Sequence, residues 1–311
     1  MKKILSIDGG GIRGIIPALV LAEIEKRTDK PISACFDLFA GTSTGGILSL
    51  GLTKADTFGR PEYSAADLAE IYASRGREIF ARSLWKGFSS VGGLTNETYS
   101  DHGLEAVLED YFKNTDLAKC LVKTMITTYD LEKREPLFLK SWRAEYADVL
   151  MRDAGRATAA APTYFEPANI AVNGEPRVLV DGGIFVNNPA MSAYAEARRI
   201  FPEEPDILLL SLGTGELVRP IYYHEAKHWG KLEWVLPLLN CMFDGMADAV
   251  DYQLNNLLEA ERYFRLQQSL TYASDDLDNA TQGNISLLQQ EAARLIQKHS
   301  LDLDKLCELI A

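Results

Sequence analysis

Short apolar runs alternate along the chain with longer segments in which apolar residues recur every three to four positions. The short runs predict β-strands and the longer segments predict helices, because side chains alternate sides in a strand but return to one face after about 3.6 residues in a helix. Strands that alternate with helices imply a mostly parallel central sheet covered on both faces, so we expect a three-layer α/β/α fold. The predicted strands are 2–7, 36–41, 122–130, 136–142, 177–183 and 206–215, and the predicted helices are 15–26, 44–52, 65–82, 101–113, 152–161, 189–200, 231–261 and 284–310.

The same pattern shows no internal repeat and no linker rich in proline or serine. A single domain is therefore expected over residues 1–311, with its core over about 1–270 and a C-terminal helical extension over 271–311. The least regular stretch is 85–100. An ordinary surface loop is the preferred interpretation of that stretch, and a mobile cap beside a site is the alternative.

Composition narrows the classes of function. The chain has 311 residues and a formal net charge of −12, whereas proteins that bind nucleic acid polymers usually present a basic face. The four cysteines are scattered without a C-x-x-C pair, and no apolar run approaches the ~18 residues of a membrane-spanning helix. The short apolar run after the first three residues is too short for a secretory signal. These features predict a cytoplasmic protein, peripheral at the membrane when active.

A glycine-rich loop, "DGGGIRG" at 8–14, lies between the first predicted strand and the first predicted helix. Gly9, Gly11 and Gly14 match the dinucleotide fingerprint G-x-G-x-x-G, but the same amides could instead hold an oxyanion. The dinucleotide interpretation expects an acidic residue at the end of the second strand. That strand ends in "FAGTSTG" without an acid at its tip, so the oxyanion interpretation is favoured.

Ser43 lies in "GTSTG", between the second predicted strand and the helix that follows it. The pattern G-x-S-x-G at a strand-to-helix turn is typical of a nucleophile elbow, in which larger residues at Gly41 and Gly45 would collide with neighbouring backbone. A small-residue turn that only packs the helix on the sheet is the alternative.

A nucleophilic serine needs a base, and the four histidines (His102, His224, His228, His299) do not follow predicted strands. His224 and His228 have the spacing of a metal pair but no third ligand nearby, so no metal site is expected. Asp181 does end a predicted strand, and functional groups gather at the carboxyl ends of parallel strands.

Gly182 and Gly183, which follow Asp181, would let its carboxylate approach Ser43 directly, as a dyad. A turn-forming and helix-capping role for Asp181 is the alternative.

Together these motifs resemble the patatin-like phospholipase family. The resemblance is carried, in chain order, by "DGGGIRG", "GTSTG", "ATAAAPTYFEPA", "DGG" and "VNNPA", over roughly residues 1–270. It implies Ser43 as nucleophile and Asp181 as its base. It also implies an oxyanion hole made by the amides of Gly9, Gly10 and Gly11, with Arg13 supporting the loop.

The resemblance implies a phospholipase A or lysophospholipase type of lipid acyl hydrolase that works through an acyl-serine and needs no metal or organic cofactor. Its substrate would be membrane phospholipid or another acyl lipid at an interface. Two alternatives stay open: a phospholipase effector of bacterial antiviral defence with a cyclic nucleotide as activator, and a storage or binding protein with vestigial esterase activity.

Two further stretches have weaker functional interpretations. The apolar and aromatic segment 231–246 is expected to be helix core, with an interfacial face toward lipid as the alternative. Arg152 and Arg156 are expected to be solvated residues at a helix start, with contact to a lipid phosphate as the alternative.

Overall fold

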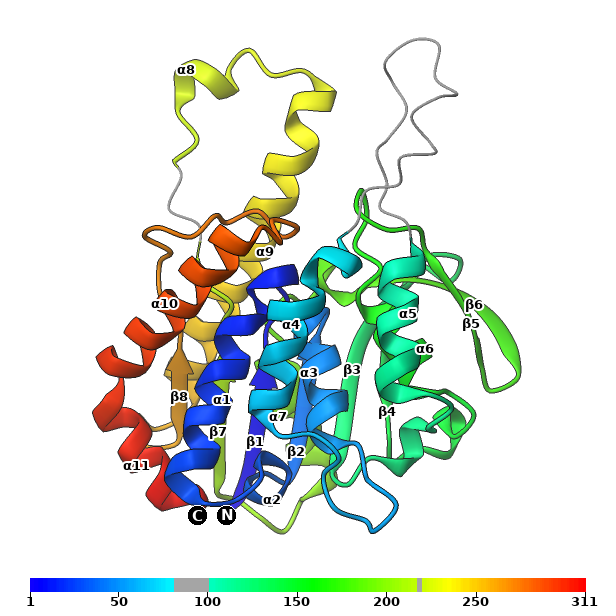
Figure 1. Ribbon diagram of the computed structural model, residues 1–311, viewed down its shortest axis with the longest axis vertical. Helices are drawn as coiled ribbons and strands as arrows, with labels where there is room; N and C mark the ends of the chain where they lie inside the picture. Colours follow the sequence, from blue (N-terminus) through cyan, green and yellow to red (C-terminus); the bar gives the residue numbers. More distant parts are fainter. Residues whose placement is uncertain (81–100, 217–219) are drawn as a thin grey trace.

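The computed structural model describes residues 1–80, 101–216 and 220–311 (Figure 1). The stretch 85–100, predicted as a surface loop, lies outside the described residues, as does the end of the predicted helix 65–82.

Within the described residues, eight strands form one sheet in the order β5-β6-β3-β2-β1-β7-β8, and β4 pairs with β3 outside this path. The pairs that join β1, β2, β3, β7 and β8 are all parallel, whereas β4 and β6 pair with β3 in antiparallel fashion, as β5 does with β6. The predicted mostly parallel sheet is confirmed. The strands are β1 (Lys2–Ile7), β2 (Leu38–Thr42), β3 (Lys123–Asp130), β4 (Glu135–Lys140), β5 (Ala168–Val172), β6 (Glu175–Asp181), β7 (Ile207–Leu212) and β8 (Tyr263–Leu266).

The sequence analysis missed β5 and β8. In β5 buried and exposed residues alternate, and the strand is joined to β6 by Asn173 and Gly174, both with positive φ. Asn-Gly between alternating segments is a strong signal for a β-hairpin, so this strand could have been predicted. The four-residue strand β8 has no comparable signal.

The three-layer arrangement follows from the alternation of side chains along the central strands. In β1, Leu5 and Ile7 belong to the larger core cluster and Ile4 to the smaller one, on the opposite face. The smaller cluster packs under α7 (Ala190–Ile200) and the C-terminal part of α9 (Lys231–Leu257). The larger cluster packs under seven helices: α1 (Ile15–Thr28), α3 (Thr44–Thr53), α4 (Ala65–Ile79), α5 (Asp101–Phe112), α6 (Met151–Thr158), α10 (Gln282–Lys298) and α11 (Ser300–Ile310). Two further α-helices in the described residues, α2 (Ile32–Cys35) and α8 (Tyr223–Ala226), have four residues each.

The C-terminal helices belong to the main body of the protein. Helix α10 lies beside α1 (Figure 1), and its residues Leu288, Ala292 and Leu295 are fully buried in the larger core cluster. Residue 270 therefore marks no boundary in the packing. The predicted single helix 284–310 is divided at His299, whose ring pairs with Asp302 in the first turn of α11.

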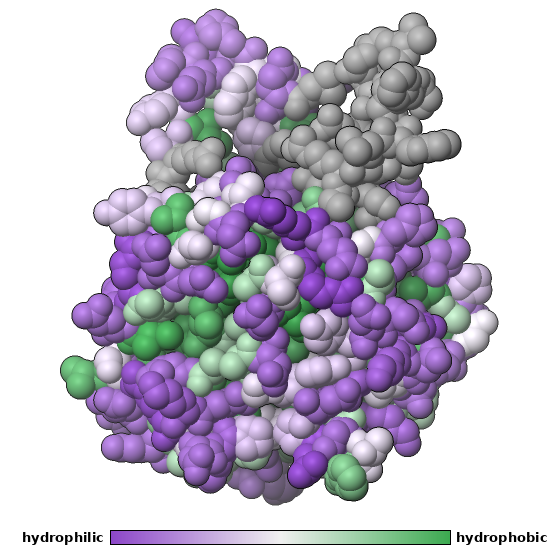
Figure 2. Space-filling view, in the orientation of Figure 1, coloured by the Kyte–Doolittle hydropathy of each residue, from purple (hydrophilic) through white to green (hydrophobic). Residues whose placement is uncertain are grey.

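Hydrophilic residues cover most of the face seen in Figure 2, and hydrophobic ones show mainly between them.

Glu291 on α10 binds the segment 268–272, which precedes this helix in the chain. Its buried carboxylate accepts hydrogen bonds from the amides of Thr271 and Tyr272, at 2.9 and 3.0 Å, and from the side chain of Gln268 at 3.0 Å. Arg294 pairs with the same carboxylate at 2.8 Å. A buried charge is tolerated when it is paired and hydrogen-bonded in this way.

We expect Glu291→Ala to lower the free energy of unfolding by about 2–4 kcal/mol, because it removes the buried acceptor of the Thr271 and Tyr272 amides and the partner of Arg294. Urea denaturation of the purified protein measures this. The matched control is Glu308→Ala on the exposed face of α11, which should change stability by less than about 0.5 kcal/mol. Equal effects of the two substitutions would contradict the anchoring role of Glu291.

Candidate active site

The residues predicted from three separate motifs meet at one cavity of about 60 Å³. Those that line it directly are Gly9, Gly10, Gly11, Arg13, Ser43, Asp181 and Gly183. Gly14, Gly41, Gly45 and Gly182 lie behind this lining, where they allow close packing. A Cβ at Gly14 would overlap the Thr44 hydroxyl, and one at Gly182 would overlap the Thr127 hydroxyl.

Ser43 lies on the turn from β2 to α3 with φ 53° and ψ −123°. Positive φ is strained for a residue that carries a side chain, and such strain persists only where the surroundings impose it. The surroundings here are crowded backbone, because a Cβ at Gly41 would overlap the Gly45 carbonyl and one at Gly45 would overlap the Ile7 carbonyl. This geometry has the form of the predicted nucleophile elbow.

Thr158, at the end of α6, fixes the backbone of this turn. Its hydroxyl accepts a hydrogen bond from the Ser43 amide at 2.8 Å and donates one to the Thr127 carbonyl at 2.7 Å. Thr158 lies within the "ATAAAPTYFEPA" motif, but the sequence analysis assigned it no role. The bond also shows that the Ser43 amide is occupied and does not face the cavity as a free donor.

Asp181 reaches Ser43 by a different route from the one predicted. β6 is antiparallel to β3, so Asp181 does not end a parallel strand of the sheet. Thr42, the last residue of β2, pairs with Thr127 on β3, and Asp181, the last residue of β6, pairs with Thr128. The ends of β2 and β6 therefore meet along the same edge of β3.

The Asp181 side chain is buried and lines the cavity together with Ser43, whose side chain favours the ionised carboxylate. Its Oδ1 also accepts a hydrogen bond from the Gly183 amide at 2.7 Å. Burial raises the pKa of this carboxyl to about 7, because desolvation disfavours the charged form more than the Ser43 side chain and the Gly183 amide favour it. A carboxylate with a pKa near neutrality is suited to take up and return a proton.

The glycine loop presents fewer free amides than predicted. The Gly9 amide, predicted as an oxyanion donor, donates to the Asn187 carbonyl at 3.1 Å and is therefore already paired in this structure. Within the described part of the chain, the amides of Gly10 and Gly11 donate no backbone hydrogen bond. Gly11 has φ 56°, and a Cβ there would overlap the carbonyl oxygen of Leu277. That same oxygen accepts the Ile12 amide at 2.9 Å.

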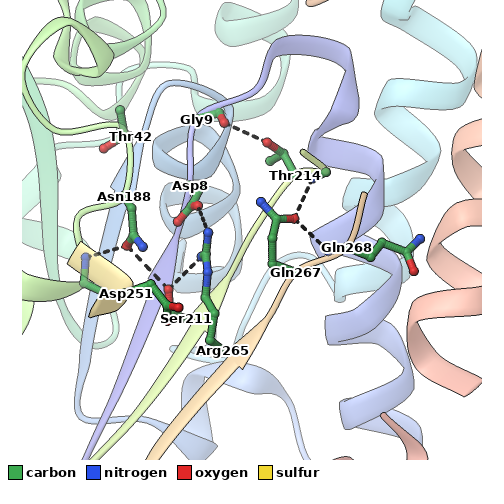
Figure 3. Close-up of polar contacts among 12 residues, drawn as sticks. Asp8, Gly9, Thr42, Asn188, Ser211, Thr214, Asp251, Arg265, Gln267 and Gln268 are labelled. Carbon is green, nitrogen blue, oxygen red and sulfur yellow. Dashed lines mark hydrogen bonds and ion pairs between the residues drawn. The ribbon is translucent and has the colours of Figure 1, made fainter. Parts of the chain in front are cut away.

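Arg13 binds the carbonyl groups of the loop and of the chain after β7, in keeping with the supporting role that the family resemblance implies. Its Nε donates to the Gly10 carbonyl at 3.3 Å, and its Nη1 donates to the Gly215 carbonyl at 3.2 Å. Thr214 donates to the Gly9 carbonyl at 2.8 Å (Figure 3). The carbonyls of Gly9 and Gly10 are thus held by buried donors.

A buried ion pair links the base of the loop to β8. Arg265 on β8 donates to the Asp8 carboxylate at 2.7 Å and to the Ser211 hydroxyl at 2.9 Å (Figure 3). Asp8 is the first residue after β1, so the pair joins the ends of β1, β7 and β8. Arg265 lies in a strand that the sequence analysis missed, and no motif pointed to it.

The rest of the cavity wall is largely apolar and aromatic. It is contributed by Ile47, Tyr72, Ile79, Phe80, Leu104, Tyr164, Phe165, Phe243 and Leu277, among others. All four histidines lie in described segments, and none of them lines the cavity.

The chain matches the family model described as patatin-like phospholipase over residues 5–194. The chain belongs to the patatin-like phospholipase family. The match spans the glycine loop, the Ser43 turn and Asp181, and this family comprises lipid acyl hydrolases.

Plant patatins are similar to almost the whole chain. "Probable inactive patatin-3-Kuras 1" of Solanum tuberosum is 33% identical over 96% of this chain and 87% of its own length. "Patatin-15" of the same species is 32% identical over 96% of this chain and 84% of its own length. A solved structure, VipD from Legionella pneumophila, aligns with a TM-score of 0.38 at 11% identity, over 94% of this chain and 67% of that chain. Because one relative is named inactive, membership of the family does not by itself establish activity.

This patatin-like chain departs from the predictions for the segment 231–246 and for Arg152 and Arg156. The segment 231–246 is not helix core, because Trp234, Leu238 and Met242 are 38%, 49% and 39% exposed. Arg156 is buried rather than solvated and pairs with Glu105 at 3.3 Å, while Arg152 pairs with Glu109. Neither arginine is part of the cavity lining.

No helix in the described ranges is long and apolar enough to cross a membrane. Among residues 1–80, 101–216 and 220–311, no group of three or more His, Cys, Asp or Glu side chains could hold a metal ion.

We expect Asp181→Asn to stabilise the fold above neutral pH. The carboxyl pKa rises from 3.8 to about 7 on folding, so the native state holds its proton more tightly and wild-type stability falls as pH rises through that range. Asparagine keeps the acceptor for Gly183 without the buried charge. Thermal unfolding should show a gain of up to about 4 kcal/mol at about pH 8 that vanishes below about pH 4. A gain in stability that does not change with pH would contradict the conclusion that ionisation of buried Asp181 destabilises the wild type.

Proposed function

We propose that this protein is a serine lipid acyl hydrolase of the phospholipase A or lysophospholipase type. The observation that carries the proposal is that one cavity is lined both by Ser43, on a strained turn, and by Asp181, a buried carboxyl with a pKa of about 7. A serine that only filled a turn would need neither the strain nor the buried partner.

Acylation uses the chain's own groups. The Ser43 Oγ attacks the ester carbonyl carbon while the Asp181 carboxylate takes the hydroxyl proton, and the carbonyl oxygen becomes an oxyanion. The free amides of Gly10 and Gly11 support an oxyanion hole at that position, with the Thr44 amide at the start of α3 as a further donor. The tetrahedral centre then expels the alcohol, which takes the proton from Asp181, and leaves the acyl group on Ser43.

Deacylation repeats the same proton transfers with water. Asp181 takes a proton from a water molecule whose oxygen attacks the acyl carbon. The Ser43 Oγ leaves and regains its proton from Asp181, and a fatty acid is released. Asp181 therefore starts and ends the cycle ionised, and no metal or organic cofactor takes part in the proposed route.

The cavity walls support an acyl lipid as the substrate class. Aliphatic and aromatic side chains on α3, α4, α5 and α9 surround the approach to Ser43, and such walls favour a hydrocarbon chain over a small polar ester. The proposed source of that chain is membrane phospholipid or another acyl lipid presented at an interface.

The test is the release of fatty acid from mixed phospholipid vesicles. Ser43→Ala and Asp181→Asn should each lower the rate by roughly 10³-fold or more, because the two residues act as a unit. The matched controls are Ser74→Ala and Asp206→Asn, which alter exposed residues and should keep the wild-type rate. Parallel assays with cyclic oligonucleotides cover the ligand-activated form of the enzyme. If the wild type and Ser43→Ala are equally inert in every condition, the hydrolase proposal is wrong.

The pH dependence is a second test of the dyad. The reaction needs ionised Asp181, so kcat/KM should rise about tenfold per pH unit below about 7 and level off above it. Stopped-flow or steady-state kinetics with a soluble ester, whose own ionisation does not change over this range, measures the profile. A flat profile from about pH 5 to 8 would exclude Asp181 as the base.

A further inference from the structure

A second cavity, of about 30 Å³, lies between α3, α4 and α5. Apart from the hydroxyls of Tyr72 and Tyr111, the side chains around it are hydrocarbon. Ile47, Tyr72, Ile79 and Leu104 line both this cavity and the one that contains Ser43. The two spaces are therefore neighbours that share a single apolar wall.

Each of the three helices turns one face toward this wall. On α3, Ile47 lies one turn after Ser43, on the same side of the helix. On α4, Tyr72 and Ile79 are seven residues apart, which again places them on one face. On α5, Leu104 is followed by Val107 and Leu108 at helical spacing, and both of these line the second cavity only. The apolar surface thus continues from the nucleophile into the interior.

Tyr72 is held in a fixed position within the shared wall. Its buried hydroxyl is hydrogen-bonded to the hydroxyl of Thr44, the residue after the nucleophile. This bond satisfies the hydroxyl and leaves the ring as the surface that the two cavities share. No charged side chain of the described residues lines the second cavity.

An apolar void of this kind lowers stability unless something occupies it. Protein interiors are packed nearly as densely as organic crystals, and unfilled space next to aliphatic side chains sacrifices dispersion contacts. A cavity lined by leucine, isoleucine and phenylalanine stays dry and binds small apolar molecules. A volume of about 30 Å³ holds about two groups of the size of a methylene.

We propose that the second cavity receives the distal end of the fatty-acyl chain whose carbonyl lies at Ser43. The acyl chain runs along Ile47, Tyr72 and Leu104, which line both cavities. Val107, at the second cavity, limits how far the acyl chain reaches. This inference rests on the proposed hydrolase function and adds to it a binding site for the acyl tail that determines chain-length preference.

The experiment uses opposite changes at Val107, assayed with p-nitrophenyl esters from butyrate to palmitate. Val107→Phe fills the cavity and should move the optimum chain length about two carbons shorter. Val107→Ala enlarges the cavity and should move the optimum in the opposite direction. Each methylene that loses its site should lower kcat/KM about fourfold, so roughly 15-fold for two, while butyrate hydrolysis stays near the wild-type rate. Val20→Ala, a buried position on α1 away from both cavities, is the matched control and should leave the optimum unchanged.

Unchanged optima in both variants, with normal butyrate hydrolysis, would overturn the acyl-tail site and leave the hydrolase proposal intact. If the wild type hydrolyses no ester, the proposed function fails, and titration calorimetry with laurate then tests the cavity directly. Weaker laurate binding by Val107→Phe than by the wild type supports the site. Equal or undetectable binding in both proteins rejects it.

Discussion

The buried contact between Asp181 and Ser43 constrains much of the architecture around it. A carboxylate removed from water is unfavourable unless polar neighbours compensate, and here the Gly183 amide donates a hydrogen bond while the Ser43 side chain favours the charged form. The contact requires two chain segments to approach closely, and that approach requires Gly182 beside Thr127 and glycines on both sides of Ser43. The partial compensation leaves the carboxyl pKa near 7, which suits the proposed proton transfers.

The glycine loop has the opposite requirement in the proposed mechanism, because donors that are to hold an oxyanion must be left without protein acceptors. The surrounding structure meets this requirement by binding the loop through its carbonyls and through the amides at its two ends. Thr214 and Arg13 hold the carbonyls of Gly9 and Gly10, while Asn187 and Leu277 accept the amides of Gly9 and Ile12. Between these fixed points, the amides of Gly10 and Gly11 donate no backbone hydrogen bond to any residue that the structure describes. Preorganised donors stabilise a developing oxyanion most strongly, because they need no reorganisation during the reaction.

Family membership and local geometry support different parts of the functional conclusion. The match to the patatin-like family and the similarity to plant patatins establish the general class, but one of those relatives is named inactive. The activity proposed for this chain therefore depends on its own dyad, its free amides and its apolar walls. The same walls continue into the second cavity, so the cavity that contains Ser43 and the proposed acyl-tail site share side chains such as Tyr72.

The sequence by itself determined the fold class, the Ser43 turn, the candidate base and the glycine loop. Alternation and helical periodicity are local properties, and the G-x-S-x-G and Asp-Gly-Gly patterns record steric limits that act within a few residues. Local patterns could not show that β6 is antiparallel to β3, that the Gly9 amide is occupied by Asn187, or that Leu277 and Arg265 support the loop. Nor could they show that Trp234 and Leu238 on α9 are exposed while α10 is part of the core. Those features depend on contacts between residues far apart in the chain, and only the tertiary structure decides which partners meet.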